Sequence, residues 1–355
     1  MVKRIIFIGL TLIFFVVPRV YASVSLPEIE DEPFFNNVVE EMSEGKFSFD
    51  ATEIIKMVIK LITDEITESR KLILSIVLIC AVSSSAYLIG TSFGVKGVGE
   101  ASFYACFCIV CSTAIRYFCI ALEYAKDVVT VMSMFVTKLA PLMTTMLILS
   151  GKATSAAVFH PVLSGGIYIV ALIVENWLIP LITYGTVLSV VNNMSNAVHI
   201  SGICKLINGI TKWILAASFT LFSGLCGIYG FSAPALDVMG TKTMKFAVGS
   251  LVPVVGGFLS ETLETVLGGS AMMKGVVGSA GIAAIGVICA VPAVKIGILI
   301  LMLKLTAAIT EPISDKRISK LLWDVAGSVT MLFGMVVTFA ILFIICISII
   351  IGATN

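Results

Sequence analysis

The sequence predicts an all-α, polytopic membrane protein with about eight transmembrane helices. Three observations predict this class. The 355 residues are 58% hydrophobic and 13% charged, which is far too apolar for a soluble domain. Apolar runs long enough to cross about 30 Å of hydrocarbon recur along the chain. Of the twelve lysines and arginines in the connections between those runs, eight fall in alternate connections, as the positive-inside rule favours.

The N-terminus carries the features of an export signal. Lys3 and Arg4 precede an apolar run over residues 5–17, and "VYA" at 20–22 offers small residues at the two positions that a signal peptidase reads. We therefore expect residues 1–22 to be a cleaved signal peptide. The alternative is an uncleaved first membrane helix, although the run is short for a span. In both cases the chain that follows lies outside the cytoplasm.

Residues 23–71 form the predicted exported segment, which is acidic. It holds twelve acidic and five basic residues, a balance typical of an exposed stretch on the outer side. Within it, "ATEIIKMVIKLITDEITESRK" at 51–71 has the helical periodicity of an amphipathic helix. That helix would lie on the membrane surface, against a partner, or on its own protein.

Residues 72–355 form the predicted transmembrane domain. Its apolar runs are 72–90, 101–122, 128–149, 157–174, 177–194, 213–230, 276–303 and 325–351. Alternation from an outer start places the basic connections around Lys96, Lys152, Lys205 and Lys316 in the cytoplasm, and leaves the C-terminal Asn355 outside.

The stretch 246–275 is apolar but interrupted. Pro253 and Gly268 break it, and Glu261 and Glu264 lie in its middle. Because non-helical backbone at membrane depth requires burial in protein or a water-filled cavity, the pattern predicts a re-entrant helical hairpin. A candidate repeat also relates 139–194 to 251–306, with prolines and glycines matched at an offset of 112 residues.

Charged residues inside apolar runs are the candidate functional residues. An unpaired charge near the centre of a membrane helix costs at least about 2.5 kcal/mol on insertion scales, so such side chains should face protein or water. The candidate polar path consists of Arg116, Lys138, Glu175, Glu261, Glu264 and Lys295. For Arg116 and Glu175 the alternative is that they reach the headgroups with their stems buried. The predicted helix kinks are Pro141, Pro180, Pro253 and Pro292.

Glycines at intervals of three residues predict tight helix packing. They are Gly224, Gly227 and Gly230 in "SGLCGIYG", and Gly275, Gly278 and Gly281 in "KGVVGSAG". The sequence does not choose between contacts within one chain and contacts between subunits.

Enzyme chemistry finds little support, and we expect no catalytic residue, metal or cofactor. The chain has two histidines, and "SGKAT" lacks the flanking residues of a phosphate loop. The cysteines of "ACFCIVC" lie in a predicted span without histidine or carboxylate close by, so packing is the better account than metal binding.

Four long stretches of the chain, in order, resemble the stage III sporulation protein AE family of endospore-forming Firmicutes. They are "KLAPLMTTMLILSGKATSAAVFHPVL", "ENWLIPLITYGTVLSVVNNMS", "FSAPALDVMGTKTMKFAVGSLVPVVGGFLSETLETVLGGS" and "EPISDKRISKLL". The resemblance runs from about residue 45 to the end and brings no established catalytic residues with it.

The resemblance implies a permease-like or channel-forming subunit of the sporulation stage III A complex, in the mother-cell-derived outer membrane around the engulfed forespore. It implies as partners the other stage III A operon proteins, stage II sporulation protein Q and a YidC-type insertase for folding, with no nucleic acid. The complex sustains forespore gene expression after engulfment. The alternative function is a membrane scaffold that assembles partner subunits without forming the conduit.

Overall fold

The structure is a computed structural model that describes residues 73–85, 96–149, 153–194, 200–251, 285–286 and 288–353, and the single positions 59, 63, 67 and 70. Within these residues the chain is helical apart from Ile200 and the turn 311–315. The predicted signal peptide, nearly all of the exported segment and most of the predicted re-entrant hairpin lie outside the described residues. Four positions of the predicted amphipathic helix are described, and all four are helical and exposed.

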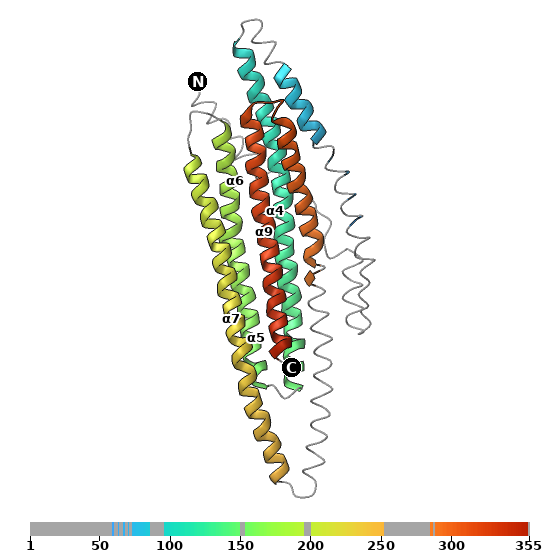
Figure 1. Ribbon diagram of the computed structural model, residues 1–355, viewed down its shortest axis with the longest axis vertical. Coiled ribbons are helices and arrows are strands. Elements are labelled where there is room, and N and C mark those ends of the chain that lie inside the picture. Colours follow the sequence, from blue (N-terminus) through green and yellow to red (C-terminus); the bar gives the residue numbers. More distant parts are fainter. Residues whose placement is uncertain are drawn as a thin grey trace.

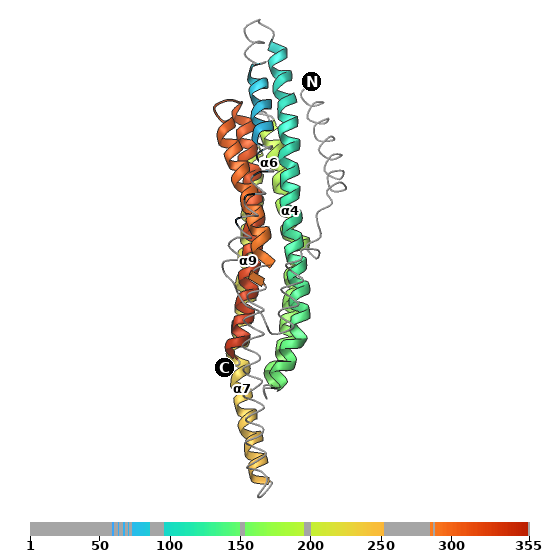
Figure 2. The same cartoon turned by 90° about the vertical axis from the view of Figure 1, so that its right-hand side faces the viewer.

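The described helices form one elongated bundle along a common axis (Figures 1 and 2). They are the short helix Ile73–Ser85, α4 (Lys96–Leu149), α5 (Ala153–Ile173), the π-helix η2 (Val174–Leu178), α6 (Ile179–Met194), α7 (Ser201–Leu251), the helix Ile288–Thr310 and α9 (Lys316–Ala353). Five stretches in the described part are helices long and apolar enough to cross a membrane. The all-α, polytopic fold class is confirmed, while the number of eight crossings is not.

One helix occupies two of the predicted spans. α4 runs without a break through Glu123 and Asp127, where the sequence predicted a connection between spans 101–122 and 128–149, so that prediction is wrong. The reason is that "EYAKD" holds charges but no glycine or proline, and charge ends an apolar run without ending a helix. At 54 residues α4 is about 80 Å long, more than twice the thickness of the hydrocarbon layer.

The chain from Ala153 to Met194 is also helical throughout, although two spans were predicted there. The helix widens at η2, where the Ile179 N–H donates to the carbonyl oxygen of Val174, five residues back. Pro180 follows directly. Because proline has no N–H and its ring crowds the carbonyl four residues earlier, the local shift into a π-turn keeps the helix continuous past it.

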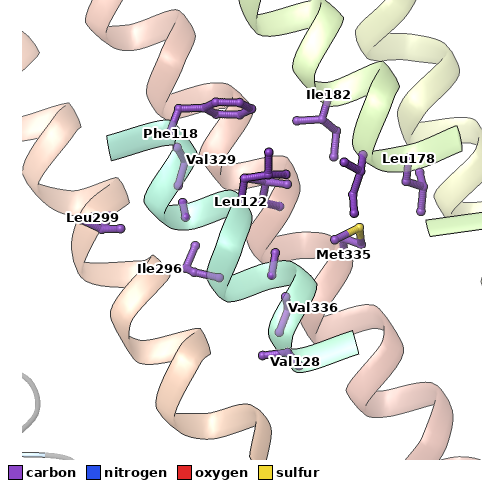
Figure 3. Packing of buried hydrophobic residues seen from close by; sticks show 14 of the residues in the cluster. Phe118, Leu122, Val128, Leu178, Ile182, Ile296, Leu299, Val329, Met335 and Val336 are labelled. Atoms are coloured by element: carbon purple, nitrogen blue, oxygen red, sulfur yellow. The ribbon is translucent and has the colours of Figure 1, made fainter. Parts of the chain in front are cut away.

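α9 lies at the centre of the bundle and packs against α4, α6 and α7. Its buried side chains include Val329, Met335 and Val336, which meet Leu122 of α4 and Ile182 of α6 in a continuous apolar core (Figure 3). The helix Ile288–Thr310 contributes Ile296 and Leu299 to the same core (Figure 3). Such packing fixes the positions of the polar side chains described next.

Polar contacts join the helices at the end of the bundle that holds the turn 311–315. The Ser319 hydroxyl on α9 donates to the carbonyl oxygen of Ala307 at 3.0 Å. The Arg317 guanidinium lies over the Phe103 ring of α4, 3.6 Å from its centroid. The start of α9 is therefore tied to both neighbouring helices.

Candidate polar site in the helical bundle

Two of the predicted charged residues lie on the surface of the described bundle. Arg116 on α4 and Glu175 in η2 are both exposed. Lys138 lies in α4, one turn before Pro141. Glu261 and Glu264 lie outside the described residues, so the predicted polar path is not assembled within the described part of the chain.

Lys295 is held between helices. Its ammonium nitrogen lies 5.2 Å from the centroid of the Tyr124 ring of α4, and the side chain is half-buried. A cation over an aromatic face is attracted by the ring, and more strongly where water is excluded. Lys295 therefore has a defined partner inside the protein, at the level where α4 carries Glu123 and Asp127.

The predicted kink positions behave differently from one another. Pro141 is exposed within α4, which continues past it to Leu149. Pro180 follows the π-helix, where a local change of helical register does occur. Pro292 is buried within the helix Ile288–Thr310. Pro253 lies outside the described residues, as does much of the second half of the candidate repeat.

The predicted glycine ridge does not make close contacts in the described part of the bundle. A Cβ added to Gly224 or Gly227 would meet nothing within 4 Å. Gly230 lies in α7, and Gly275, Gly278 and Gly281 lie outside the described residues. Close approach occurs instead at Gly166 of α5, where an added Cβ would overlap the Phe222 ring of α7.

The sequence reasoning missed a polar pair between α6 and α9. The Asn193 side-chain amide donates a hydrogen bond of 2.6 Å to the carboxylate of Asp324. Asn193 is buried, with 2% of its surface exposed. The same amide nitrogen donates to the backbone carbonyl of Ser189 at 2.8 Å, so the amide is held in one orientation.

A signal for this pair was present in the sequence. Asp324 directly precedes the predicted span 325–351. The helix has no boundary at that point, because α9 begins at Lys316 and carries Asp324 inside it. Asn192 and Asn193 interrupt the apolar run that ends at Met194. What the sequence lacked was the contact between α6 and α9 that brings the two side chains together.

The cysteines lie mostly in the core. Cys106, Cys111 and Cys119 are buried, and Cys108 is exposed. The Cys289 thiol lies 3.1 Å from the sulfur of Met132. Within the described residues no group of three or more His, Cys, Asp or Glu side chains is placed to hold a metal ion.

Long apolar helices with a cation, a carboxylate and an amide held between them define a multi-pass integral membrane protein. The comparisons with known proteins then give the family. The model of the stage III sporulation protein AE family matches residues 34–354, and the chain belongs to that family.

A curated relative supports the assignment. The stage III sporulation protein AE of Bacillus subtilis (strain 168) is 29% identical over 315 residues, which cover 89% of this chain and 79% of the relative. No solved structure matches the chain.

Proposed function

We propose that this chain is a permease-like or channel-forming membrane component of the sporulation stage III A complex. In this proposal the complex links the mother cell and the forespore and is needed for forespore gene expression after engulfment. The chain acts with the other stage III A proteins and with stage II sporulation protein Q, and folds with a YidC-type insertase. It has no enzymatic activity and binds no nucleic acid.

The proposal includes a location and an orientation. The chain lies in the mother-cell-derived outer forespore membrane, with a cleaved signal peptide. Its exported N-terminal segment and its C-terminus face the extracytoplasmic side, where partner subunits meet them. Family membership and the apolar helices support a multi-pass sporulation membrane protein. The location and the orientation are proposed in addition.

The observation that best supports a conduit is the position of Lys295 between helices. A membrane helix that needed only to pack would hold an aliphatic side chain here, because a charge between membrane helices is costly. Instead the ammonium group lies over Tyr124, half-buried, three residues after the buried Pro292. Cations kept at such positions are typical of polar paths through membrane proteins.

The test compares Lys295→Met with Lys295→Arg in a spore-forming host whose native copy has been replaced. Methionine keeps the length and apolar stem but removes the charge, whereas arginine keeps the charge. The matched control is Lys316→Met, which removes an exposed lysine at the start of α9. Two quantities are measured: forespore reporter expression after engulfment, and recovery of the other stage III A proteins with the tagged chain.

The conduit predicts that Lys295→Met abolishes reporter expression while the complex is still recovered, and that arginine restores expression. If Lys295→Met instead fails to accumulate or to recover its partners, the lysine is structural. The membrane scaffold is then the better function. The control variant should retain both expression and assembly.

A further inference from the structure

A partly exposed carboxyl group, that of Asp324, lies at the contact between α6 and α9, next in sequence to buried apolar residues. Asp324 follows the start of α9 by about two turns. Its neighbours Leu321, Leu322 and Val325 have no exposed surface. Across the interface stands the buried Asn193. The carboxyl group therefore contacts protein on the side that faces α6.

The supply of hydrogen-bond donors to this carboxyl group is small. An ionised carboxylate offers about four acceptor positions. Among the described residues, Asn193 is the side chain that donates to it, and the second N–H of that amide is used by the Ser189 carbonyl. The Ser328 hydroxyl, one turn further along α9, donates to the backbone carbonyl of Asp324 rather than to its side chain.

The nearby charges leave the carboxyl group weakly compensated. Within the described chain, the charge that acts on it is that of Lys320, one turn earlier on α9, whose side chain is exposed. α6 presents the uncharged Asn193. Among the cations of the other helices whose exposure the structure describes, Arg116 on α4 and Lys205 and Lys212 on α7 are exposed, Lys126 and Lys304 are half-buried, and Lys295 lies over Tyr124.

We propose that Asp324 is a proton-binding site whose occupancy controls the contact between α6 and α9. The apolar neighbours disfavour the charged form, whereas the amide of Asn193 favours it. In the ionised state the hydrogen bond from Asn193 is charge-assisted and therefore strong. When a proton from water binds the carboxylate, the charge is lost and the bond that joins the two helices weakens. The inference does not depend on the conduit.

The chain offers its own reporter for the test. It contains three tryptophans, and Trp323 is the residue next to Asp324. The Trp177→Phe, Trp213→Phe double variant leaves Trp323 as the single tryptophan. The full chain is reconstituted in lipid nanodiscs. Trp323 fluorescence and the infrared carbonyl band of a protonated carboxyl group are then recorded across the pH range in which the protein stays folded.

We expect the Trp323 fluorescence and one component of the carbonyl band to follow one titration curve. Asp324→Asn should abolish the fluorescence change and that component, while the bands of the other acids remain. Asparagine keeps the shape of the side chain and still offers a carbonyl oxygen to Asn193, so the fold should survive. The matched control is Glu311→Gln, at an exposed acid in the turn before α9, which should leave the curve unchanged. The proposal is overturned if the carbonyl band of Asp324→Asn equals that of the parent chain, if the fluorescence change persists in that variant, or if no fluorescence change occurs at any pH tested.

A second variant makes the test independent of the folding of the first. Asn193→Leu leaves the carboxyl group in place and removes its donor, so the midpoint of the titration should shift. An unchanged midpoint would overturn the pairing. Neither measurement uses forespore gene expression, so failure of this inference and failure of the proposed conduit are distinguishable.

Discussion

At the scale of single residues, the tightest contact at a described glycine is at Gly166, which the sequence pattern did not include among the packing glycines. Gly166 of α5 faces the ring of Phe222 on α7, which in turn meets Phe343 of α9 edge to face with centroids 6.4 Å apart. These three residues connect three helices. Any atom added to the glycine has to displace an aromatic ring that is itself packed.

We therefore predict that Gly166→Ala destabilises the bundle by about 1–3 kcal/mol, the usual range for overpacking a filled site. The matched control is Gly165→Ala, because an added Cβ there meets nothing within 4 Å. The free energy of unfolding in a mixed detergent series, followed by circular dichroism, measures both. Equal stabilities of the two variants would contradict the close packing at Gly166.

A second residue-scale prediction concerns Asp315, which caps α9. Its carboxylate accepts the backbone N–H of Arg317 at 2.9 Å and the guanidinium of the same residue at 3.0 Å. Burial disfavours its charge, but these hydrogen bonds and the cation outweigh burial and hold the pKa of Asp315 below its ordinary value. The carboxylate form is thus the one that stabilises the folded state.

Since the folded pKa is lowered, the stabilisation by Asp315 is fully present above the pKa of a free aspartate. It is lost as the pH falls through the folded value. We predict that Asp315→Ala costs about 1 kcal/mol at neutral pH, the usual value for a lost N-cap, and progressively less in acid. Unfolding free energies of both chains at neutral and acidic pH check this. A cost that does not decline in acid would contradict the role of the ionised cap.

The candidate site shows how far single residues can be predicted from sequence. A lysine inside an apolar run is visible by inspection, and Lys295 does have a partner between helices in the structure. Asp324 was left out because the apolar run was begun one residue after it. Its importance comes from Asn193, 131 residues away along the chain, and a local pattern does not contain that contact.

At the scale of elements, the sequence identified helices well and their ends poorly. Apolar runs mark where a chain can meet lipid, and each predicted run that the structure describes is helical. Helix ends were predicted at Glu123–Asp127 and near Glu175, but the helix is continuous at both places. At both places charged residues interrupt the apolar run, but they favour or tolerate the helix, so the backbone hydrogen bonds continue.

One link between elements can be tested alone. The buried hydroxyl of Ser319, with 4% of the residue exposed, donates to the Ala307 carbonyl of the preceding helix. We predict that Ser319→Ala costs about 0.5–1.5 kcal/mol, because it leaves a buried carbonyl without that donor. Thr330→Ala is the control, since the exposed Thr330 donates within its own helix to Ala326. The same unfolding series measures both, and a larger loss in the control would contradict the link.

At the scale of the whole molecule, the two continuous helices change the expected path of the chain. α4 descends the bundle in Figure 1 once, and α5 with α6 returns once, where two crossings each were predicted. Each continuous helix removes one predicted crossing. Because two crossings are removed, the segments that follow α6 keep the sides of the membrane that the sequence predicted for them. The turn 311–315 and the start of α7 therefore share one end, while the start of α5 and the end of α9 share the other.

The distribution of basic residues predicts which end of the bundle faces the cytoplasm. Lys304, Lys316 and Lys320 lie within about two helical turns of the turn 311–315. Lys205 lies in the second turn of α7, which begins at the same end of the bundle. Short connections rich in lysine stay inside, so that end should be cytoplasmic and the C-terminal end of α9 should lie outside. We then expect the connection around Lys152, which the sequence predicted to be cytoplasmic, to lie outside, because α4 ends at Leu149 and α5 begins at Ala153 at the other end of the bundle.

The structure and the sequence pattern predict different sides of the membrane for the start of α5, and this difference can be tested. With the nine native cysteines replaced, single cysteines are placed at Thr154, in the first turn of α5, and at Ser314, in the turn before α9. The structure predicts that an impermeant thiol reagent added to sealed cells labels Thr154→Cys but not Ser314→Cys, and that opening the membrane exposes Ser314→Cys. Protection of both in sealed cells would mean that the chain turns back near residue 125 as the charges alone suggested. In that case α4 crosses the membrane twice rather than passing through it as one helix.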